Sequence, residues 1–259
     1  MKISVVIPVY NDTRIYKALN SVIAQKNCEP EIVVVDGGSN EETLAMIDRY
    51  REHIDIFVSE PDEGIFDAIN KGIKRSTGDV IIALGADDRF NHPHVFSDVV
   101  TLLSADATLE GCYGDKVMVN DSDQVVRYWK TGRYRPWKIY FGWVPPHFTL
   151  FLRREVYDRC GYFDQSYPIT ADFDFIMRIF TKYKVKLGYL EDVLLRMTIG
   201  GNSNHSLASV VNGNKESLHS CQQQFHLCYF IHFWKLARKS SQLVLAKFYR
   251  DKDRFAELG

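Results

Sequence analysis

The sequence predicts an α/β fold in which a mostly parallel sheet carries helices on both faces. Two observations carry this prediction. In the first 90 residues, short apolar runs rich in β-branched side chains alternate with amphipathic helical patterns, which is the order of strand–helix–strand units with right-handed crossovers. The apolar runs also lack an alternation of apolar and polar residues, and this continuity indicates strands that are buried on both faces.

Four apolar runs are the expected strands of this sheet. They are Ile3–Val9, Glu31–Asp36, Asp55–Val58 and Asp79–Leu84. Helical patterns lie between them at 13–25, 41–51 and 64–76. The pattern at 64–76 is the clearest, because its apolar residues recur at positions i, i+3, i+4, i+7 and i+8 of one helix face.

After residue 90 the alternation becomes less regular. Helices are expected over 92–104, 172–183 and from about 207 onward, and strands over 111–118, 125–130, 148–152 and 185–196. The strands at 111–118 and 125–130 could form a hairpin, whereas the aromatic and proline-rich stretch 131–146 is typical of irregular structure. Because no linker or repeat interrupts the chain, we expect one domain over 1–205 and a helical extension over 206–259.

Composition and charge exclude several classes of protein. The 259 residues hold 32 Lys and Arg against 33 Asp and Glu, a formal net charge of −1, so the chain lacks the basic excess of a dedicated nucleic-acid binder. The five cysteines are scattered and form no C-x-x-C pair, which favours reduced thiols in a cytoplasmic protein over disulfides or a zinc site. The chain starts on a strand-like run, so no signal peptide is expected. No apolar stretch reaches the roughly 18–20 residues that span a bilayer.

Acidic residues follow each of the four early strands. Asp12, Asp36 and Asp62 come after the first three strands, and Asp87 and Asp88 follow the fourth. Because the carboxyl ends of parallel strands line one crevice, we expect these carboxylates to gather at one edge of the sheet. Clustered carboxylates repel one another unless a cation neutralises them, and hard oxygen ligands are those of Mg²⁺ and Mn²⁺. The sequence therefore predicts a binding site at this edge for a divalent metal ion or a cationic ligand.

Each acid also has a purely structural interpretation. Asp36 and Asp62 could cap the helices that follow them. Asp87 and Asp88 could form a turn. These interpretations need four independent coincidences at one edge, whereas a single site explains all of them. The turn after the first strand has no glycine, which argues against a G-x-G-x-x-G dinucleotide site, and no P-loop is present.

Seven segments carry a further signal. They are 3–12 (ISVVIPVYND), 32–39 (IVVVDGGS), 59–72 (SEPDEGIFDAINKG), 85–88 (GADD), 146–151 (PHFTLF), 171–178 (ADFDFIMR) and 200–203 (GGNS). In this order they resemble the motifs of family 2 inverting glycosyltransferases, with the greatest likeness to bacterial exopolysaccharide enzymes of the colanic-acid type. The resemblance covers residues 1 to about 205. It implies a GT-A fold with a Rossmann-like nucleotide-binding half at 1–90 and an acceptor half at 91–205.

The resemblance also implies how a nucleotide-sugar donor is held. The implied donor-binding residues are Pro8, Tyr10, Asp36, Asp62, Gly64, Asp67, Lys71, Asp87 and His147. The first three would hold the base and its ribose, and the helix start at 64–71 would approach the phosphates. Asp88 would ligate an Mn²⁺ or Mg²⁺ ion that bridges the diphosphate, with His205 as a further candidate ligand. Ala86 stands where many relatives have the first Asp of a D-x-D motif, so the set of protein ligands is small.

Asp172 matches the catalytic base of the family. In an inverting displacement a base deprotonates the acceptor hydroxyl while that oxygen attacks the anomeric carbon from the face opposite the nucleotide. The base therefore belongs on a different element from the metal ligand. A structural interpretation of Asp172 is a first-turn acid stabilised by the helix dipole. Asp174 is the alternative base, although its i, i+4 spacing to Arg178 favours an ion pair.

The histidines have simpler interpretations as well. His147 could be a buried structural histidine whose ring nitrogens form hydrogen bonds with neighbouring groups. His92 and His94 flank a proline at a helix start, and we expect both of them at the surface.

The C-terminal stretch from Cys221 to Arg250 holds five Lys or Arg and no Asp or Glu, interleaved with aromatic residues. Its segment 225–237 is apolar on nearly every face but too short to cross a membrane. Basic and aromatic residues on a helix suit an in-plane anchor on anionic lipid. The alternative is a helix that packs on the catalytic domain or on another subunit.

The acids at the sheet edge agree with what the family resemblance implies, which is a metal-dependent inverting glycosyltransferase. It would move a hexose or related sugar from a nucleotide diphosphate, with UDP expected, to a saccharide or lipid-linked acceptor in surface-polysaccharide assembly. A cytoplasmic location with peripheral contact to the inner face of the membrane fits this activity, no nucleic-acid partner is expected, and self-association stays open. The alternative from another class is a catalytically silent subunit that binds sugar nucleotides. A sugar-phosphate nucleotidyltransferase would need a Gly-rich, Arg- or Lys-bearing loop after the first strand, and none is present.

Overall fold

The four apolar runs at the start of the chain form four neighbouring parallel strands. They are β1 (Ile3–Val9), β2 (Glu31–Asp36), β3 (Ile56–Ser59) and β4 (Val80–Ala83), in the order β3-β2-β1-β4. The computed structural model describes residues 1–199, 207–224 and 228–249. The predicted parallel arrangement is confirmed, and Asp36 at the end of β2 pairs with Val9 of β1 and Ser59 of β3. The ends of these three strands therefore lie side by side.

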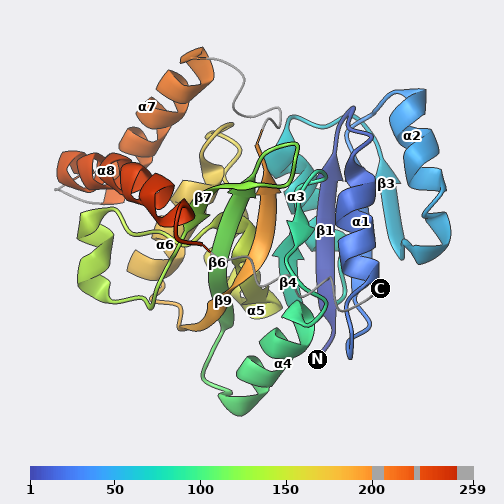
Figure 1. Ribbon diagram of the computed structural model, residues 1–259, viewed down its shortest axis with the longest axis horizontal. Coiled ribbons are helices and arrows are strands. Elements are labelled where there is room, and N and C mark those ends of the chain that lie inside the picture. Colours follow the sequence, from blue (N-terminus) through green and yellow to red (C-terminus); the bar gives the residue numbers. More distant parts are fainter. Residues whose placement is uncertain (200–206, 225–227, 250–259) are drawn as a thin grey trace.

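In the second half of the sheet, β6 (Gly111–Val119) and β9 (Leu187–Thr198) run in the same direction as β1 to β4. β8 (Phe151–Arg153) runs antiparallel between β4 and β6, so β6 points the same way as β1. β9 pairs with β6 in parallel, while β7 (Val125–Trp129) and β5 (Arg89–Phe90) pair antiparallel with β6 and β9. The carboxyl ends of β6 and β9 therefore reach the same edge as those of β1 to β4 (Figure 1).

Helices cover both faces of this sheet (Figure 1). One face carries α1 (Ile15–Ile23), α2 (Glu41–Asp48) and α4 (Val95–Ala105). The other face carries α3 (Ile65–Arg75), α5 (Arg154–Cys160) and α6 (Ala171–Thr181). The described tail adds α7 (Leu207–Gln224) and α8 (Cys228–Ala246). The short 3-10 turns are η1 (Arg51–His53), η2 (Pro136–Phe141) and η3 (His147–Thr149).

The core is formed on both faces of the parallel strands, as the continuous apolar runs predict. Val5 and Ile7 of β1 pack into one cluster and Val6 packs into the other. Gly72 lies in α3 where a Cβ would come within 2.3 Å of Val6 Cγ1. The glycine therefore lets α3 pack directly on β1.

Some boundaries differ from the predicted ones. The helix expected over 41–51 ends at Asp48, and the tighter turn η1 follows it. The strand expected over 148–152 begins as η3 and becomes β8 only at Phe151. The seven-residue helix α5 and the two-residue strand β5 are too short to give a periodic pattern, so neither was predicted. The predicted hairpin of β6 and β7 is confirmed.

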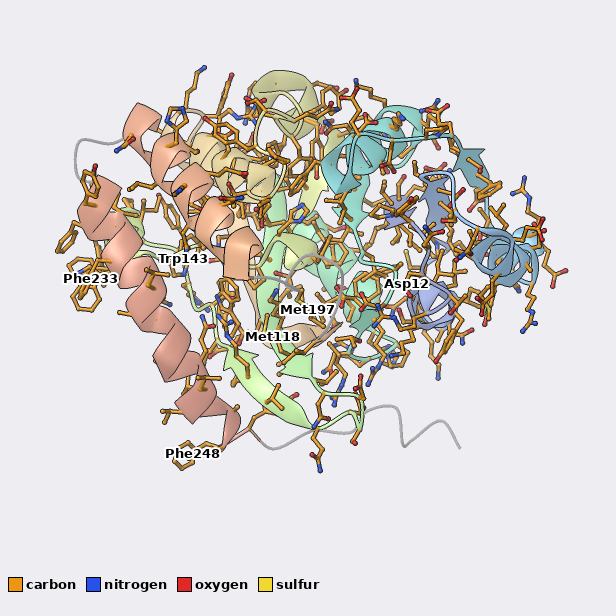
Figure 2. All side chains as sticks on the ribbon, turned by 90° about the horizontal axis from the view of Figure 1, so that it is seen from above. Asp12, Met118, Trp143, Met197, Phe233 and Phe248 are labelled. Atoms are coloured by element: carbon orange, nitrogen blue, oxygen red, sulfur yellow. The ribbon has the colours of Figure 1, made fainter. Side chains whose placement is uncertain are left out.

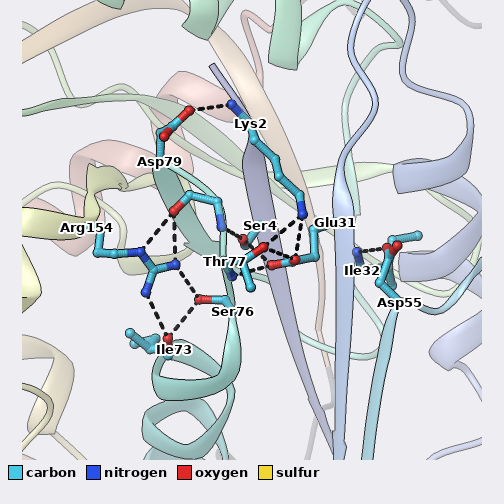
Figure 3. Close-up of polar contacts among 11 residues, drawn as sticks. Lys2, Ser4, Glu31, Ile32, Asp55, Ile73, Ser76, Thr77, Asp79 and Arg154 are labelled. Atoms are coloured by element: carbon cyan, nitrogen blue, oxygen red, sulfur yellow. Dashed lines mark hydrogen bonds and ion pairs between the residues drawn. The ribbon is translucent and has the colours of Figure 1, made fainter.

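The amino end of the sheet is closed by a polar network around Glu31 (Figure 3). Glu31 accepts hydrogen bonds from Lys2 Nζ at 2.7 Å and from Ser4 Oγ at 2.6 Å. The backbone N–H of Thr77 donates a third bond at 2.7 Å, and Arg154 Nη2 donates to the carbonyl of Gly78 at 2.9 Å. These polar groups tie β1 and β2 to the loop that precedes β4.

The C-terminal helices pack against the second half of the chain. Ser220 Oγ on α7 donates to Asp174 Oδ1 on α6 at 2.9 Å. Arg127 Nε on β7 donates to Gln242 Oε1 on α8 at 2.5 Å, and Ile231 of α8 is buried. One face of α8 therefore packs on the domain, as the packed-helix alternative expects. Within the described ranges, no helix combines the length and the apolar character needed to cross a membrane.

Candidate active site

The loops that follow β1 and β2 are bonded to each other. The backbone N–H of Asn11 donates to Ser39 Oγ at 2.8 Å, and Asn11 Oδ1 accepts from the backbone N–H of Asn40 at 2.8 Å. Asn11 holds a left-handed conformation with a φ of 48°, which asparagine adopts more readily than most residues. Pro8 is buried within β1, whereas Tyr10 is 56% exposed just beyond it. Of these two residues, Tyr10 offers the accessible surface.

Asp36 is fully buried at the end of β2. Its carboxylate accepts hydrogen bonds from Ser59 Oγ at 2.7 Å and from the backbone N–H of Ser39 at 3.2 Å. The helix cap considered for Asp36 is wrong, because Asn40 caps α2 by accepting from the backbone N–H of Thr43 at 3.0 Å. Asp36 instead shapes the turn between β2 and α2 and joins it to the end of β3.

Asp62 lies against the turn that carries Asp36. A Cβ on Gly37 would come within 2.3 Å of Asp62 Oδ2, so the missing side chain makes room for this carboxylate. Asp62 Oδ1 accepts from the backbone N–H of Gly64 at 2.9 Å. Gly64 precedes α3 with a φ of 119°, a conformation that favours glycine. Asp62 therefore bonds the start of α3 and also fills the space beside the turn after β2.

Lys71 is held by acids from its own helix and from the loop before it. Lys71 Nζ lies 3.0 Å from Asp67 Oδ2, 3.2 Å from Glu60 Oε1 and 3.1 Å from the carbonyl oxygen of Pro61. Hydrogen bonding to Asp67 raises the pKa of Lys71. These contacts tie the loop before α3 to the helix, and they already pair the charge of Lys71.

Arg14 joins the acids that follow β1 and β4. Its Nε and Nη2 donate to the Asp12 carboxylate at 2.9 and 2.6 Å, and its Nη1 lies 3.1 Å from Asp87 Oδ2. Burial acts against the charged form of Asp12, but hydrogen bonds from Arg14 outweigh it and lower the pKa of Asp12. Burial raises the pKa of Asp87, and Arg14 opposes this effect. Arg14 was not among the predicted site residues. Its place two residues after Asp12, the acid that follows the first strand, could have indicated an ion pair at this edge.

Asp88 ends the turn after β4 and is 2% exposed. Its backbone N–H donates to the carbonyl of Gly85 at 3.0 Å, so the turn interpretation is correct for the backbone. Its Oδ1 accepts from the backbone N–H of Thr198, the last residue of β9, at 3.0 Å. Burial and the neighbouring charge of Asp87 raise the pKa of Asp88. A buried carboxylate in this position favours a cation beside it.

Lys116 on β6 is a buried cation that sequence reasoning missed. The residue is 6% exposed, and its Nζ lies 3.1 Å from Met197 Sδ and 5.1 Å from the centre of the Trp129 ring. Burial lowers the pKa of Lys116, while Asp88 and Asp172 both act to raise it. The amine is therefore within electrostatic reach of one acid from each half of the chain.

Asp172 and His147 lie in the same part of the molecule. Asp172 is half-buried in the first turn of α6, and the His147 ring packs on Phe148 and Phe163 with centroid distances of 4.8 and 4.9 Å. Burial lowers the pKa of His147 to about 4, which Asp172 opposes and Lys116 reinforces. His147 is therefore a neutral imidazole near pH 7, held in an aromatic cluster beside Asp172.

The remaining candidates have different surroundings. Asp174 is 8% exposed and forms the predicted ion pair with Arg178 at 3.3 Å, so its carboxylate is part of the contact between α6 and α7. His205 lies outside the described residues. The surface position expected for His92 is wrong: the residue is fully buried, and Gln25 Nε2, two residues after the end of α1, donates to its carbonyl at 3.1 Å.

Asp88 is the residue on which a divalent metal ion would depend. Within the described ranges, no group of three or more His, Cys, Asp or Glu side chains could hold a metal by itself. Arg14 already pairs with Asp12 and Asp87. A single buried carboxylate fits Mg²⁺ or Mn²⁺ as a substrate-bridging ion, because such ions take one or two carboxylates and complete their shell with phosphates and water.

The acids and the ends of β6 and β9 border one face of the molecule. Figure 2 looks down on the carboxyl edge of the parallel strands, with Asp12 on one side and the paired residues Met118 and Met197 across from it. A Rossmann-like sheet with acids at this edge and helices on both faces defines an α/β protein of the GT-A fold. The sequence profile of "Glycosyl transferase family 2" matches residues 4–160. The chain belongs to this family, so the resemblance is confirmed at the family level.

Individual relatives agree with this assignment. A "PGL/p-HBAD biosynthesis glycosyltransferase" of Mycobacterium bovis is 28% identical over 206 residues, which cover 78% of each chain. Among solved structures, S. aureus TarS 1-349 in complex with UDP-GlcNAc is similar with a TM-score of 0.64 at 18% identity, over 93% of this chain and 74% of that one. The mannosyltransferase PcManGT of Pyrobaculum calidifontis, in complex with GDP-Man and Mn²⁺, gives 0.65 at 18% identity, over 99% and 78%. These two structures share the fold.

Proposed function

We propose that the protein is an inverting glycosyltransferase that uses Asp88 on the donor side and Asp172 on the acceptor side. The observation that supports this most is that Asp88, in the turn after β4, and Asp172, in the first turn of α6, come from different elements, while both carboxylates act to raise the pKa of the buried Lys116 on β6. A sugar bound between them would have its leaving diphosphate on one side and the acceptor hydroxyl on the other. A single displacement with inversion needs that arrangement.

The proposed donor is a UDP-sugar with a hexose as the transferred group. Two solved neighbours support a nucleotide sugar, since TarS is in complex with UDP and UDP-GlcNAc and PcManGT with GDP-Man. The base and ribose would lie over Tyr10, with Pro8 beneath and Asp36 and Asp62 beside them. Asp87, held in place by Arg14, would approach the ribose.

The diphosphate would lie between the start of α3 and Asp88. Asp88 would hold an Mn²⁺ or Mg²⁺ ion, whose charge stabilises the leaving diphosphate when it is bound; the Mn²⁺ of PcManGT supports this choice. Gly64 leaves the helix start open to phosphate, since a Cβ there would meet nothing within 4 Å. Lys116 would donate hydrogen bonds to phosphate oxygens, and neutral His147 could donate one more.

The transfer itself would be a single displacement. The acceptor hydroxyl gives its proton to Asp172 while its oxygen forms a bond to the anomeric carbon. The bond from that carbon to the phosphate oxygen breaks at the same time, and the electron pair leaves with the nucleoside diphosphate. A base positioned in this way contributes about 10²- to 10⁴-fold to the rate.

The proposed acceptor is a saccharide or a lipid-linked saccharide in surface-polysaccharide assembly, as in enzymes of the colanic-acid type. A catalytically silent sugar-nucleotide-binding subunit is the alternative. The presence of Asp36, Asp88 and Asp172 together argues against it, because a subunit that only binds nucleotide has no use for a base on α6.

The test is a melting-temperature panel followed by turnover. Full-length protein is heated with UDP, GDP, UDP-glucose, UDP-GlcNAc and GDP-mannose, with Mn²⁺ and with EDTA. We expect one nucleotide family to raise the melting temperature in Mn²⁺, by mass action on the folded state. Release of that nucleoside diphosphate from its sugar in the presence of acceptor extract would establish transfer. Binding without any release would favour the silent subunit, and no stabilisation by any of the five would contradict the proposed function.

A further inference from the structure

Two basic, acid-free segments that lie far apart in the sequence pack together in the structure. Residues 125–146 hold five Lys or Arg, and residues 228–249 hold four, with no Asp or Glu in either segment. The first segment contains η2 and the second contains α8. Phe141 of η2 contacts Phe230 and Trp234 of α8, with ring centroids 5.6 Å apart in both pairs.

The contact leaves aromatic rings of both elements exposed on one surface. We call this the aromatic surface; it is made of Trp137, Tyr140 and Phe141 from η2 and Tyr229, Phe230 and Phe233 from α8. Their exposed fractions range from 40% for Phe141 to 69% for Tyr229. Figure 2 shows Phe233 at the outer side of α8, away from the sheet. Large exposed apolar patches of this kind mark interaction sites.

Aliphatic residues extend the aromatic surface along α8. Leu236, Leu243 and Val244 are 40%, 55% and 56% exposed, and Phe248 just after the helix is 76% exposed at the far end seen in Figure 2. The opposite face of α8 is the one that Gln242 and Ile231 pack against the domain. One face of α8 is therefore buried against the domain, and the opposite face exposes apolar side chains at the protein surface.

Four described cations lie around the aromatic surface without an acidic partner among the described residues. In the described part of the chain, no ion pair involves Arg133, Arg135, Lys138 or Arg238; Lys138 donates instead to the carbonyl of Arg133 at 2.6 Å. Burial lowers the pKa of Lys138, and Arg238 and Arg135 lower it further by repulsion. These cations therefore gather at the junction of η2 and α8, where an anionic partner would stabilise them.

We propose that the aromatic surface of η2 and α8 docks on an anionic lipid bilayer, in the plane of the headgroups. Trp, Tyr and Phe rings lie favourably at the membrane interface, and Lys and Arg beside them attract anionic lipid. A second copy of the chain would bring the same cations face to face. A single-stranded nucleic acid stacks on aromatic rings but gains nothing from the exposed Leu and Val side chains.

This docking gives the proposed function a substrate class. The docking itself does not depend on the proposed function. Only the following step depends on it: if residues 91–205 bind the acceptor, docking holds that half of the chain at the membrane. The acceptor would then be a saccharide carried on a lipid. Transfer to a soluble saccharide does not need the surface, so the two proposals can fail separately.

The experiment is sedimentation of full-length protein with vesicles of phosphatidylcholine alone or with 30% phosphatidylglycerol. We expect at least tenfold stronger binding to the anionic vesicles, weakened by 0.5 M salt. The double variant W137S/F233S should lose at least tenfold of this binding. Y16S/I23S, which changes two exposed apolar residues of α1 (39% and 38%) outside the aromatic surface, should bind like the wild type.

The proposal is overturned if wild-type protein binds both vesicles equally, or if W137S/F233S and Y16S/I23S lose binding alike. It is also overturned if light scattering finds a dimer that W137S/F233S dissociates, because the surface would then be covered by a second copy. Melting temperatures of both double variants, which change only exposed side chains, verify that the fold is kept. Nucleotide binding by W137S/F233S should equal that of the wild type, and this readout separates the docking surface from the donor site.

Discussion

The backbone N–H of Thr198 donates a hydrogen bond to Asp88 Oδ1 at 3.0 Å, and Thr198 Oγ1 donates to the carbonyl of Asp87 at 2.7 Å. The last residue of β9 thus fixes both acids of the turn after β4, although 110 residues separate Thr198 from Asp88. The bond holds one carboxylate oxygen of Asp88 against the protein. Asp88 is consequently oriented before any ligand arrives, which a metal-binding carboxylate requires.

Asp88→Asn should remove the metal-dependent part of nucleotide binding. The amide oxygen can still accept from Thr198, and removing a buried charge should leave the free energy of unfolding equal or higher. We expect the affinity for UDP or GDP, whichever stabilises the wild type, to fall at least tenfold in Mn²⁺ and to change little in EDTA. Isothermal titration calorimetry measures both. Asp158→Asn, at an exposed acid of α5, is the control, and an Asp88→Asn protein that still gains affinity from Mn²⁺ would refute the assignment.

Asp172→Asn should abolish transfer while it leaves donor binding intact. The amide cannot take the proton of the acceptor hydroxyl, so kcat should fall about 10²- to 10⁴-fold with the affinity for nucleotide and Mn²⁺ within twofold. Asp174→Asn tests the alternative base in the same assay. Because Asp174 pairs with Arg178 and Ser220, its loss should lower the melting temperature and spare kcat. The reverse pattern would move the base to Asp174.

Lys116→Met should weaken diphosphate binding without a loss of stability. Methionine keeps the volume of the side chain, and Lys116 forms no ion pair with a carboxylate in the described structure, so removing the buried ammonium costs the fold little. We expect the affinity for UDP or GDP to fall about 10- to 100-fold, and the affinity for the matching monophosphate to fall less. Lys130→Met on the same hairpin, where the lysine is half exposed beside Glu191, is the control. Equal losses for diphosphate and monophosphate would show that Lys116 supports the fold of the site and does not bind the second phosphate.

The sequence predicts the parallel half of the fold well, because that half depends on local patterns. The run Ile3–Val9 is both the predicted and the observed β1, and the acids after β1 to β4 reach one edge as a direct result of parallel pairing. The same rule could not place Lys116 or Thr198. Both of them reach the site because the three-residue strand β8 inserts antiparallel beside β4 and lets β6 and β9 run parallel to β1.

Long-range pairing also explains why other features were missed. The basic character of 125–146 and of the C-terminal helix is visible in the sequence, but their union in one surface depends on the contact of Phe141 with Phe230. The buried His92 likewise bonds through its carbonyl to Gln25, which lies 67 residues earlier in the loop after α1. Local sequence patterns predict where helices and strands lie. They do not predict which strands pair, and no motif in this sequence indicates the strand order after β4.

Glu31→Gln should destabilise the protein at neutral pH and have little effect in acid. Glu31 is 3% exposed, and burial disfavours its charge, but hydrogen bonds from Lys2, Ser4 and Thr77 outweigh burial and lower its pKa to about 2. An unfolded glutamate titrates near pH 4.3, so the folded state favours the ionised form. The stabilisation is therefore complete above about pH 5 and is lost as the pH falls from about 4 toward 2.

Urea unfolding at pH 7, 5, 4 and 3 measures this dependence. At pH 7 we expect Glu31→Gln to lower the free energy of unfolding by about 1–3 kcal/mol, because the glutamine oxygen keeps one acceptor but loses the charge that pairs with Lys2 (Figure 3). The difference between variant and wild type should shrink steadily below pH 4. Glu29→Gln, at an exposed position two residues earlier, should stay within about 0.5 kcal/mol of the wild type at every pH. A constant difference from pH 7 to pH 3 would mean that the network acts through its packing and that the charge of Glu31 contributes nothing.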